Sequence, residues 1–223
     1  MSGKQGYAIG NKMRGRTWCL GMAYYYIADL HFGHNAILNF DNRPFGSTEE
    51  MEEVLVANWN AVVQPEDTVF ILGDFCWKKA DEWLRIIRRL KGSKVLIQGN
   101  HDLSTYPPEL RKEFADIKEY KEIHDNGRNV ILSHYPILFY KRSNNPKYIM
   151  LCGHVHQTGE NDYLEAWLRD MKNERIPGVM NCAQVINVGA MMPWVNYVPR
   201  TLDDILRGRE AFLKEYTGRD QNV

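Results

Sequence analysis

The chain has 223 residues, of which 44% are hydrophobic and 25% are charged, the proportions of an ordinary globular protein long enough to bury a substantial core. Basic residues and acidic residues number 28 each, so bulk charge gives no support for a nucleic-acid or anionic-membrane partner. The four cysteines are widely spaced and form no C-x-x-C pair, which favours reduced thiols and a cytoplasmic location. No apolar run approaches the ~20 residues of a membrane span.

Residues 1–21 precede the first expected strand and carry no motif. Basic residues followed by the apolar run over 18–28 imitate a secretory signal, but this run leads directly into Asp29-Leu30-His31 without a small-residue cleavage site before it. We therefore predict an accessory N-terminal extension over 1–21. Because no linker, repeat or low-complexity tract divides the rest of the chain, we predict a single domain over 22–223.

The first half of this domain alternates expected strands and helices. Apolar runs at 24–28, 68–72 and 94–98 predict buried strands. Apolar residues at helical spacing predict helices at 34–40 and 80–90, and a third helix that runs from an N-cap at Ser47 or Thr48 to Val62. The strand over 68–72, the helix after it and the strand over 94–98 form one βαβ unit. Its two strands should be parallel neighbours, with their carboxyl ends at the same edge of the sheet.

The second half continues with shorter elements. A short helix is expected at 107–114, and Asp125-Asn126-Gly127 is typical of a hairpin turn. Residues 162–172 fit either a helix or a loop, and Thr201 is a candidate N-cap for a last helix over 201–216. The expected strands are 117–123, 129–132, 148–151, 179–182 and 184–188.

Side chains that bind metals gather at the ends of these apolar runs. Gly99-Asn100-His101-Asp102 directly follows the strand over 94–98, at the end where open α/β sheets place their ligands. Six of the seven histidines lie at or just after the end of an apolar run, namely His31, His34, His101, His134, His154 and His156. Five separated segments should thus bring their side chains to one sheet edge.

The candidate ligands are oxygen and imidazole donors without a thiolate: Asp29, His31, Asp74, Asn100, His134, His154 and His156. Such a set suits divalent ions, with Mn²⁺ favoured and Fe, Zn, Ni or Mg as alternatives. Seven donors are too many for one transition ion but suit two ions that share a bridging carboxylate. A pair of ions ~3.5–4 Å apart clamps the oxygens of a phosphoryl displacement and generates a hydroxide nucleophile at neutral pH.

The five blocks are similar, in this order, to the motifs of the calcineurin-like metallophosphoesterases: Asp29-x-His31, Gly73-Asp74, Gly99-Asn100-His101-Asp102, His134 and Gly153-His154-x-His156. The match covers about residues 24–188. The flanking His31-Phe32-Gly33-His34-Asn35 and Arg43-Pro44-Phe45 resemble small stand-alone bacterial and phage members. The resemblance implies an α/β (α+β) fold, a four-layer αββα sandwich with two mixed sheets.

The resemblance also implies two ligand sets that share Asp74 as a bridge. One set contains Asp29, His31 and His156, and the other contains Asn100, His134 and His154.

His101 in such enzymes lies beside the metals as a phosphate contact or as the general acid to the leaving group, and Asp102 would orient it. The residues themselves agree with this assignment. Two adjacent side chains cannot easily both point at one ion, so Asn100 as a ligand leaves His101 free for chemistry.

Weaker candidates surround these blocks. His34 would bind substrate, or else form a cap or loop hydrogen bond. Arg43 would bind a substrate phosphate, or else form a surface salt bridge. The aromatic residues Trp77, Tyr135 and Trp194 would stack on a base or aryl leaving group, with core packing as the alternative.

We therefore expect metal-dependent hydrolysis of a phosphate ester, with a phosphodiester favoured over a phosphomonoester and a nucleotide as one candidate substrate. The alternatives are a nuclease acting on DNA or RNA, which would need a basic track that a neutral chain does not favour, and a binding scaffold without chemistry. The site should be fairly open, because the chain has no obvious cap domain.

Overall fold

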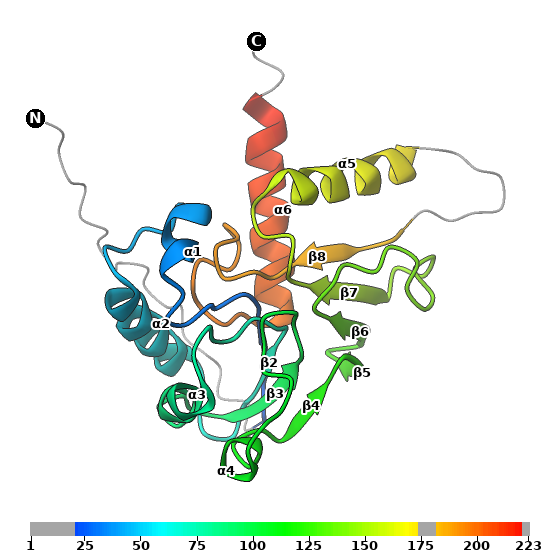
Figure 1. Cartoon of the computed structure of the whole chain (residues 1–223). Coiled ribbons are helices and arrows are strands. Elements are labelled where there is room, and N and C mark those ends of the chain that lie inside the picture. Colours follow the sequence, from blue (N-terminus) through cyan, green and yellow to red (C-terminus); the bar gives the residue numbers. More distant parts are fainter. Residues whose placement is uncertain (1–20, 174–181, 220–223) are drawn as a thin grey trace, which may run out of the picture.

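Two four-stranded sheets form the centre of the computed structural model, which describes residues 21–173 and 182–219 (Figure 1). The first sheet has the order β1-β2-β3-β4, with all neighbouring strands parallel. Its strands are β1 (Tyr24–Ile27), β2 (Thr68–Ile71), β3 (Ser93–Ile97) and β4 (Asp116–Lys118). Arg200 adds an antiparallel bridge to Tyr26 of β1.

The second sheet has the order β5-β6-β7-β8. It is mixed, because β5 and β6 are antiparallel whereas β6, β7 and β8 are parallel. Its strands are β5 (Tyr120–Asp125), β6 (Arg128–Ser133), β7 (Tyr148–Cys152) and β8 (Val185–Asn187).

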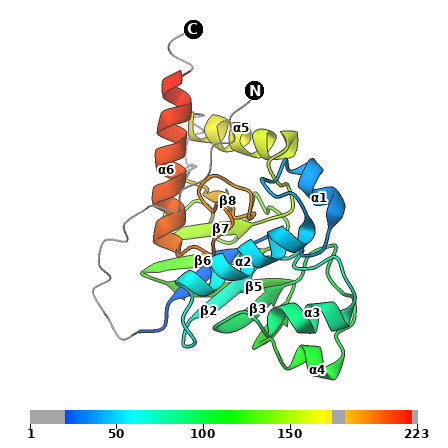
Figure 2. The same cartoon turned by 90° about the vertical axis from the view of Figure 1, so that its left-hand side faces the viewer.

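Helices cover the outer faces of the two sheets (Figures 1 and 2). Trp59 of α2 and Trp83 of α3 join the main hydrophobic core, which also contains apolar side chains of both sheets. Leu164 and Leu168 of α5 belong to a second core cluster with Met150 of β7. The helices are α1 (Asn35–Phe40), α2 (Thr48–Val62), α3 (Ala80–Ile87), α4 (Pro108–Arg111), α5 (Gly159–Asn173) and α6 (Leu202–Arg219).

The expected four-layer αββα sandwich is thus confirmed, with α2 and α3 on one side and α5 on the other. The first sheet is mixed only through the bridge of Arg200 to Tyr26, because its four strands are parallel. The segment over 162–172 is helical, within α5, and Thr201 accepts a hydrogen bond from the backbone N–H of Asp204 (3.3 Å), as an N-cap of α6 should. Among the described residues, no helix is long and apolar enough to cross a membrane.

One strand prediction was wrong. Residues 117–123 do not form a single strand, because the chain leaves the first sheet after Lys118 and enters the second at Tyr120. Each piece has its own partner, β3 for β4 and β6 for β5. The helix expected to extend to residue 90 ends at Ile87. Most of the strand expected at 179–182 and nearly all of the predicted extension over 1–21 lie outside the described residues.

Parallel pairing brings the carboxyl ends of β1, β2 and β3 to one edge of the first sheet. The second sheet meets the first at this end, where Ala28 forms a parallel bridge with Gly189, the second residue after β8. Gly153, just after β7, lies so close to β1 that a Cβ atom there would be 2.6 Å from the Asp29 carboxylate. The turn after β7 therefore requires glycine, and it brings the following residues to the Asp29 side chain.

Candidate metal centre

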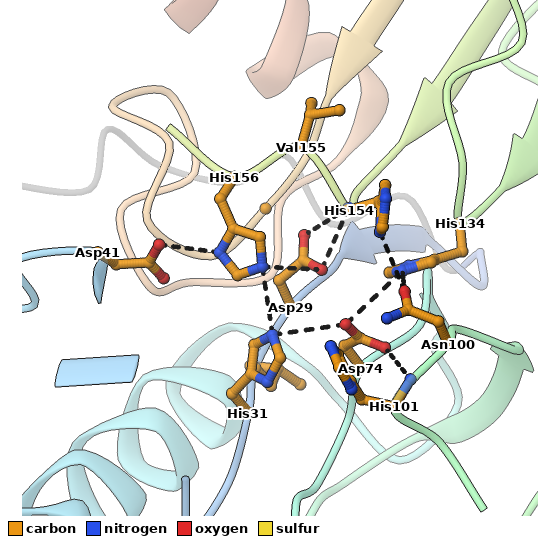
Figure 3. Close-up of polar contacts among 12 residues, drawn as sticks. Asp29, His31, Asp41, Asp74, Asn100, His101, His134, His154, Val155 and His156 are labelled. Atoms are coloured by element: carbon orange, nitrogen blue, oxygen red, sulfur yellow. Dashed lines mark hydrogen bonds and ion pairs between the residues drawn. The ribbon is translucent and has the colours of Figure 1, made fainter. Parts of the chain in front are cut away.

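Four buried side chains form a compact group where the two sheets meet (Figure 3). One donor atom from each of Asp29, His31, Asp74 and His156 lies within 4.8 Å of the others. His31 Nε2 is 3.3 Å from His156 Nε2 and 3.5 Å from Asp74 Oδ2, and His156 Nε2 is 3.9 Å from Asp29 Oδ1. These residues follow three different strands, β1, β2 and β7.

A second group adjoins the first through Asp74. Asn100 Oδ1 lies 2.9 Å from His134 Nε2 and 3.0 Å from His154 Nδ1. Asp74 Oδ2 is 3.6 Å from His134 Nε2, almost the same distance that separates it from His31 Nε2 in the first group. One carboxylate oxygen thus faces both groups, as expected of a bridging ligand.

In His134 and His156, the hydrogen bond at Nδ1 determines whether Nε2, which faces the site, carries a lone pair. His134 Nδ1 is 2.8 Å from the carbonyl oxygen of Leu72, and His156 Nδ1 is 2.8 Å from Asp41 Oδ1. Each of these nitrogens donates a proton, so in the neutral ring Nε2 carries a lone pair. Metal-binding histidines have this outer-shell arrangement.

The lone pairs then face other acceptors. His134 Nε2 faces Asp74 Oδ2, and His156 Nε2 faces Asp29 Oδ1. With both rings neutral, this arrangement of lone pairs and carboxylate oxygens is repulsive unless a cation lies between them, so the donor set fits divalent metal ions.

Burial strengthens the electrostatic attraction that these side chains would exert on a cation. Asp29 and Asp74 are 0% and 1% exposed, and removal from water raises the pKa of Asp29. Burial, together with the charge of Arg43, lowers the pKa of His31 far below its usual value, which keeps the ring neutral and able to bind a metal. Burial lowers the pKa of His156 as well, but the hydrogen bond from its ring to Asp41 and the charge of Asp29 outweigh it, and the net shift is upward.

The backbone of the ligand residues is unusual. Asp29, His31, Asp74, His154 and His156 all have φ between 47° and 70°, the left-handed region that costs side-chain-bearing residues about 1–3 kcal/mol each. Tight turns of this kind directly after a strand aim the ligands at the point where the two sheets meet. Such strain is typical of functional sites.

His101 lies beside this centre and is exposed. Its backbone N–H donates to Asp74 Oδ1 (2.9 Å), and its ring centroid is 5.9 Å from that of His31 and 4.5 Å from that of Trp77. Its side chain lines the pocket beside the candidate ligands. A catalytic role for His101 stays a prediction at this point.

Contrary to expectation, the carboxylate of Asp102 binds backbone N–H groups and not the His101 ring. Its Oδ1 accepts the backbone N–H of Phe75 (2.8 Å), and its Oδ2 accepts those of Gly99 (2.8 Å) and Asp74 (3.1 Å). Burial raises the pKa of Asp102 to about 6. The carboxylate therefore joins the loops after β2 and β3, and the expectation that it orients His101 was wrong.

Arg43 is neither a substrate contact nor part of a surface salt bridge. Its side chain is 0% exposed, and its ion-pair partner Asp41 is 1% exposed. Its Nη2 and Nη1 also donate to the backbone carbonyl groups of Asp29 and Leu30. Both interpretations of Arg43 from the sequence were therefore wrong, because the guanidinium lies under the site instead of facing solvent.

His34 lies next to the site, at the N-terminus of α1. Its ring stacks on Trp77 with a centroid distance of 3.9 Å and an interplanar angle of 6°, and its Nδ1 is 3.4 Å from His31 Nδ1. A substrate role for His34 stays a prediction. Trp194 is buried and packs against Phe212, as the packing alternative expected.

The two donor groups border a pocket of about 260 Å³. Ala36, Ile37 and Phe40 of α1 form an apolar wall of this pocket, and the Phe40 ring packs edge-on against His156 with centroids 5.4 Å apart. Phe40 is 64% exposed, and Tyr135 (48% exposed) packs its ring edge-on against His154. The sequence did not indicate this wall, because nothing in the spacing of a short helix shows which of its sides faces the site.

Asp41 is a further residue of the site that the sequence did not indicate. Its carboxylate contacts His156, which is 115 residues further along the chain. The one available signal was its position two residues before Arg43, in a segment that resembles known proteins.

Known proteins are similar to this chain over most of its length. The family model for calcineurin-like phosphoesterases matches residues 22–185. An uncharacterised protein of Methanocaldococcus jannaschii is 31% identical over 185 residues, which cover 82% of this chain and 89% of that protein. The gene 66 protein of Mycobacterium phage L5 is 37% identical over 81 residues, 35% of this chain and 39% of that protein.

A solved structure also resembles the whole fold. A protein of unknown function from Aquifex aeolicus has a TM-score of 0.60 and 29% identity, with 84% of this chain and 99% of that chain covered. The similarity therefore extends well beyond the short motifs around the site.

Proposed function

Because the chain belongs to the calcineurin-like phosphoesterase family, whose members hydrolyse phosphate esters, we propose that it is a phosphoesterase with two divalent metal ions and a preference for phosphodiesters. The shared carboxylate carries this proposal. Asp74 Oδ2 is 3.5 Å from His31 Nε2 in one donor group and 3.6 Å from His134 Nε2 in the other. Two ions that share one carboxylate oxygen would be close enough to act on the same phosphate.

The proposed ligands are Asp29, His31, Asp74 and His156 for one ion and Asp74, Asn100, His134 and His154 for the other. Mn²⁺ is the favoured metal, with Fe, Zn, Ni and Mg as alternatives, since the donors are oxygen and imidazole. When bound, the two ions supply Lewis-acid charge for the phosphate and activate water at neutral pH.

His101 is proposed to contact the phosphate or to protonate the leaving group. Its exposed ring lines the pocket, and the hydrogen bond from its backbone N–H to Asp74 fixes it relative to the proposed bridging ligand. Removal of a general acid typically costs about 10²–10⁴-fold in rate.

The pocket supports the choice of a phosphodiester. An organic substituent on the phosphate would lie against the apolar wall of Ala36, Ile37 and Phe40. None of the described residues that line the pocket is lysine or arginine, so the lining offers little for the second charge of a monoester or for the backbone of a nucleic acid. The proposed location is the cytoplasm, which the free thiols of Cys76, Cys152 and Cys182 favour.

The direct test compares the Mn²⁺-loaded protein on bis(p-nitrophenyl) phosphate and on p-nitrophenyl phosphate. We expect a higher kcat/KM for the diester, loss of activity on chelation, and His101→Ala protein that binds both ions but loses most turnover. A preference for the monoester would overturn the diesterase assignment. Failure to hydrolyse either ester with two ions bound would favour a binding scaffold.

A further inference from the structure

The loop that follows α1 carries a buried ion pair directly beneath the proposed metal centre. Asp41 Oδ2 accepts hydrogen bonds from Nε (2.9 Å) and Nη2 (2.8 Å) of Arg43. Both side chains are almost completely buried. A buried ion pair contributes little net stability, because desolvation offsets the attraction. Its position therefore suggests another role.

The other oxygen of Asp41 faces the metal centre. Asp41 Oδ1 accepts the Nδ1–H of His156 at 2.8 Å. Because Arg43 holds the carboxylate from its other side, the imidazole has one preferred orientation, with Nε2 directed at Asp29 and His31. Carboxylate partners of this kind fix the tautomer and the orientation of a metal-binding histidine.

Arg43 also binds the backbone of the turn that carries two other proposed ligands, Asp29 and His31. Nη2 donates to the carbonyl oxygen of Asp29 (2.8 Å) and Nη1 to that of Leu30 (2.9 Å). Asp29 and His31 are in the left-handed conformation, with φ of 53° and 51°. The guanidinium thus supplies partners to two successive carbonyl groups of a strained turn. A lysine ammonium lacks this planar fork.

We propose that Asp41 and Arg43 are positioning residues for one metal site, the one formed by Asp29, His31 and His156. The inference rests on the proposed dinuclear centre. Apart from a contact of Arg43 Nη1 with Met51 Sδ (3.5 Å), the side-chain hydrogen bonds that this pair forms with other described residues run to His156 and to the backbone of residues 29 and 30. Asn100, in contrast, contacts His134 and His154. Loss of the pair should therefore affect the two ions unequally.

The test is calorimetric titration of metal-free wild-type, Asp41→Asn and Arg43→Lys protein with MnCl₂. Outer-shell substitutions typically weaken metal binding about 10–100-fold. We expect both variants to show a loss of this size for one of the two ions, with the affinity for the other nearly unchanged. Because Asp41→Asn is isosteric, it decides the test if Arg43→Lys does not fold, and circular dichroism checks the fold of each variant.

Glu52→Gln provides the matched control. Glu52 is also a nearly buried carboxylate, paired with Arg85 (2.6 Å) and Arg89, but none of these groups contacts a proposed ligand. This variant should bind both ions like the wild type. Wild-type affinity for both ions in folded Asp41→Asn, or an equal loss of both, would overturn the inference. A wild-type chain that binds fewer than two ions would instead contradict the proposed function.

Discussion

Asp102→Asn distinguishes a carboxylate that joins two loops from one that orients a catalytic histidine. The asparagine can retain one acceptor, and at the Oδ2 position this oxygen keeps the hydrogen bonds from Gly99 and Asp74. Its amide nitrogen then faces the N–H of Phe75, a residue that is 0% exposed. A lost hydrogen bond to a charged acceptor and an unpaired buried donor together lower the free energy of unfolding by about 2–4 kcal/mol.

Urea denaturation of the metal-free protein at pH 8 measures this change, since Asp102, with a pKa of about 6, is ionised there. His101→Ala serves as the comparison, because its exposed side chain can be removed at a cost within about 0.5 kcal/mol. The reasoning is refuted if Asp102→Asn unfolds like the wild type while the pH profile of kcat shifts. That result would show that Asp102 acts through the His101 ring.

Three further predictions use the same protein. Mn²⁺ at about 100 times its dissociation constant should stabilise the fold by about 2.7 kcal/mol per ion. Addition of EDTA should therefore lower the unfolding midpoint of the Mn²⁺-loaded protein, and an unchanged midpoint would count against the site. Phe40→Ala should lower kcat/KM for bis(p-nitrophenyl) phosphate about 5–10-fold through loss of an aromatic contact; an equal effect of Phe139→Ala, a residue 78% exposed and outside the pocket lining, would argue against that contact. Burial raises the pKa of Asp125 despite a hydrogen bond from Tyr26. Near this pKa the folded state therefore binds more protons than the unfolded state. The free energy of unfolding should fall as the pH rises from about 4 through the folded pKa. Asp125→Asn should remove this loss, and parallel pH profiles for the two proteins would contradict it.

Part of the site was predictable from chain order alone. Asp74 and Asn100 follow two strands joined by a helix, and β2 and β3 are indeed adjacent and parallel. Parallel strands end at the same edge, so their polar residues had to meet. The pattern also predicted that the segments of His134 and His154 would reach the same place, but it assigned all five segments to one sheet edge. His134 and His154 instead follow β6 and β7 of a second sheet, which meets the first at this point.

The supporting contacts were beyond sequence reasoning for a physical reason. Asp102 is adjacent to His101 in sequence, but its carboxylate bonds to backbone N–H groups of a loop 27 and 28 residues away. Because arginine is usually exposed, the sequence predicted a surface position for Arg43. The fold instead buries it against the strained turn after β1, where it binds the carbonyl groups of Asp29 and Leu30. Partners of this kind depend on tertiary geometry, and residue type or spacing alone does not determine them.

The break between β4 and β5 escaped prediction for a related reason. Ile117, Tyr120 and Ile123 continue the apolar character across the junction, and no glycine or proline interrupts it. The pattern therefore predicts strand throughout, and it cannot indicate which sheet each part joins.

The central claim is that Asp74 lies between two metal ions. Anomalous diffraction from crystals of the Mn²⁺-loaded protein tests it most directly. The account predicts two manganese peaks about 3.5–4 Å apart, on either side of the Asp74 carboxylate, one beside His31 and His156 and the other beside His134 and His154. A single peak at full loading, or two peaks that do not share Asp74, would contradict it.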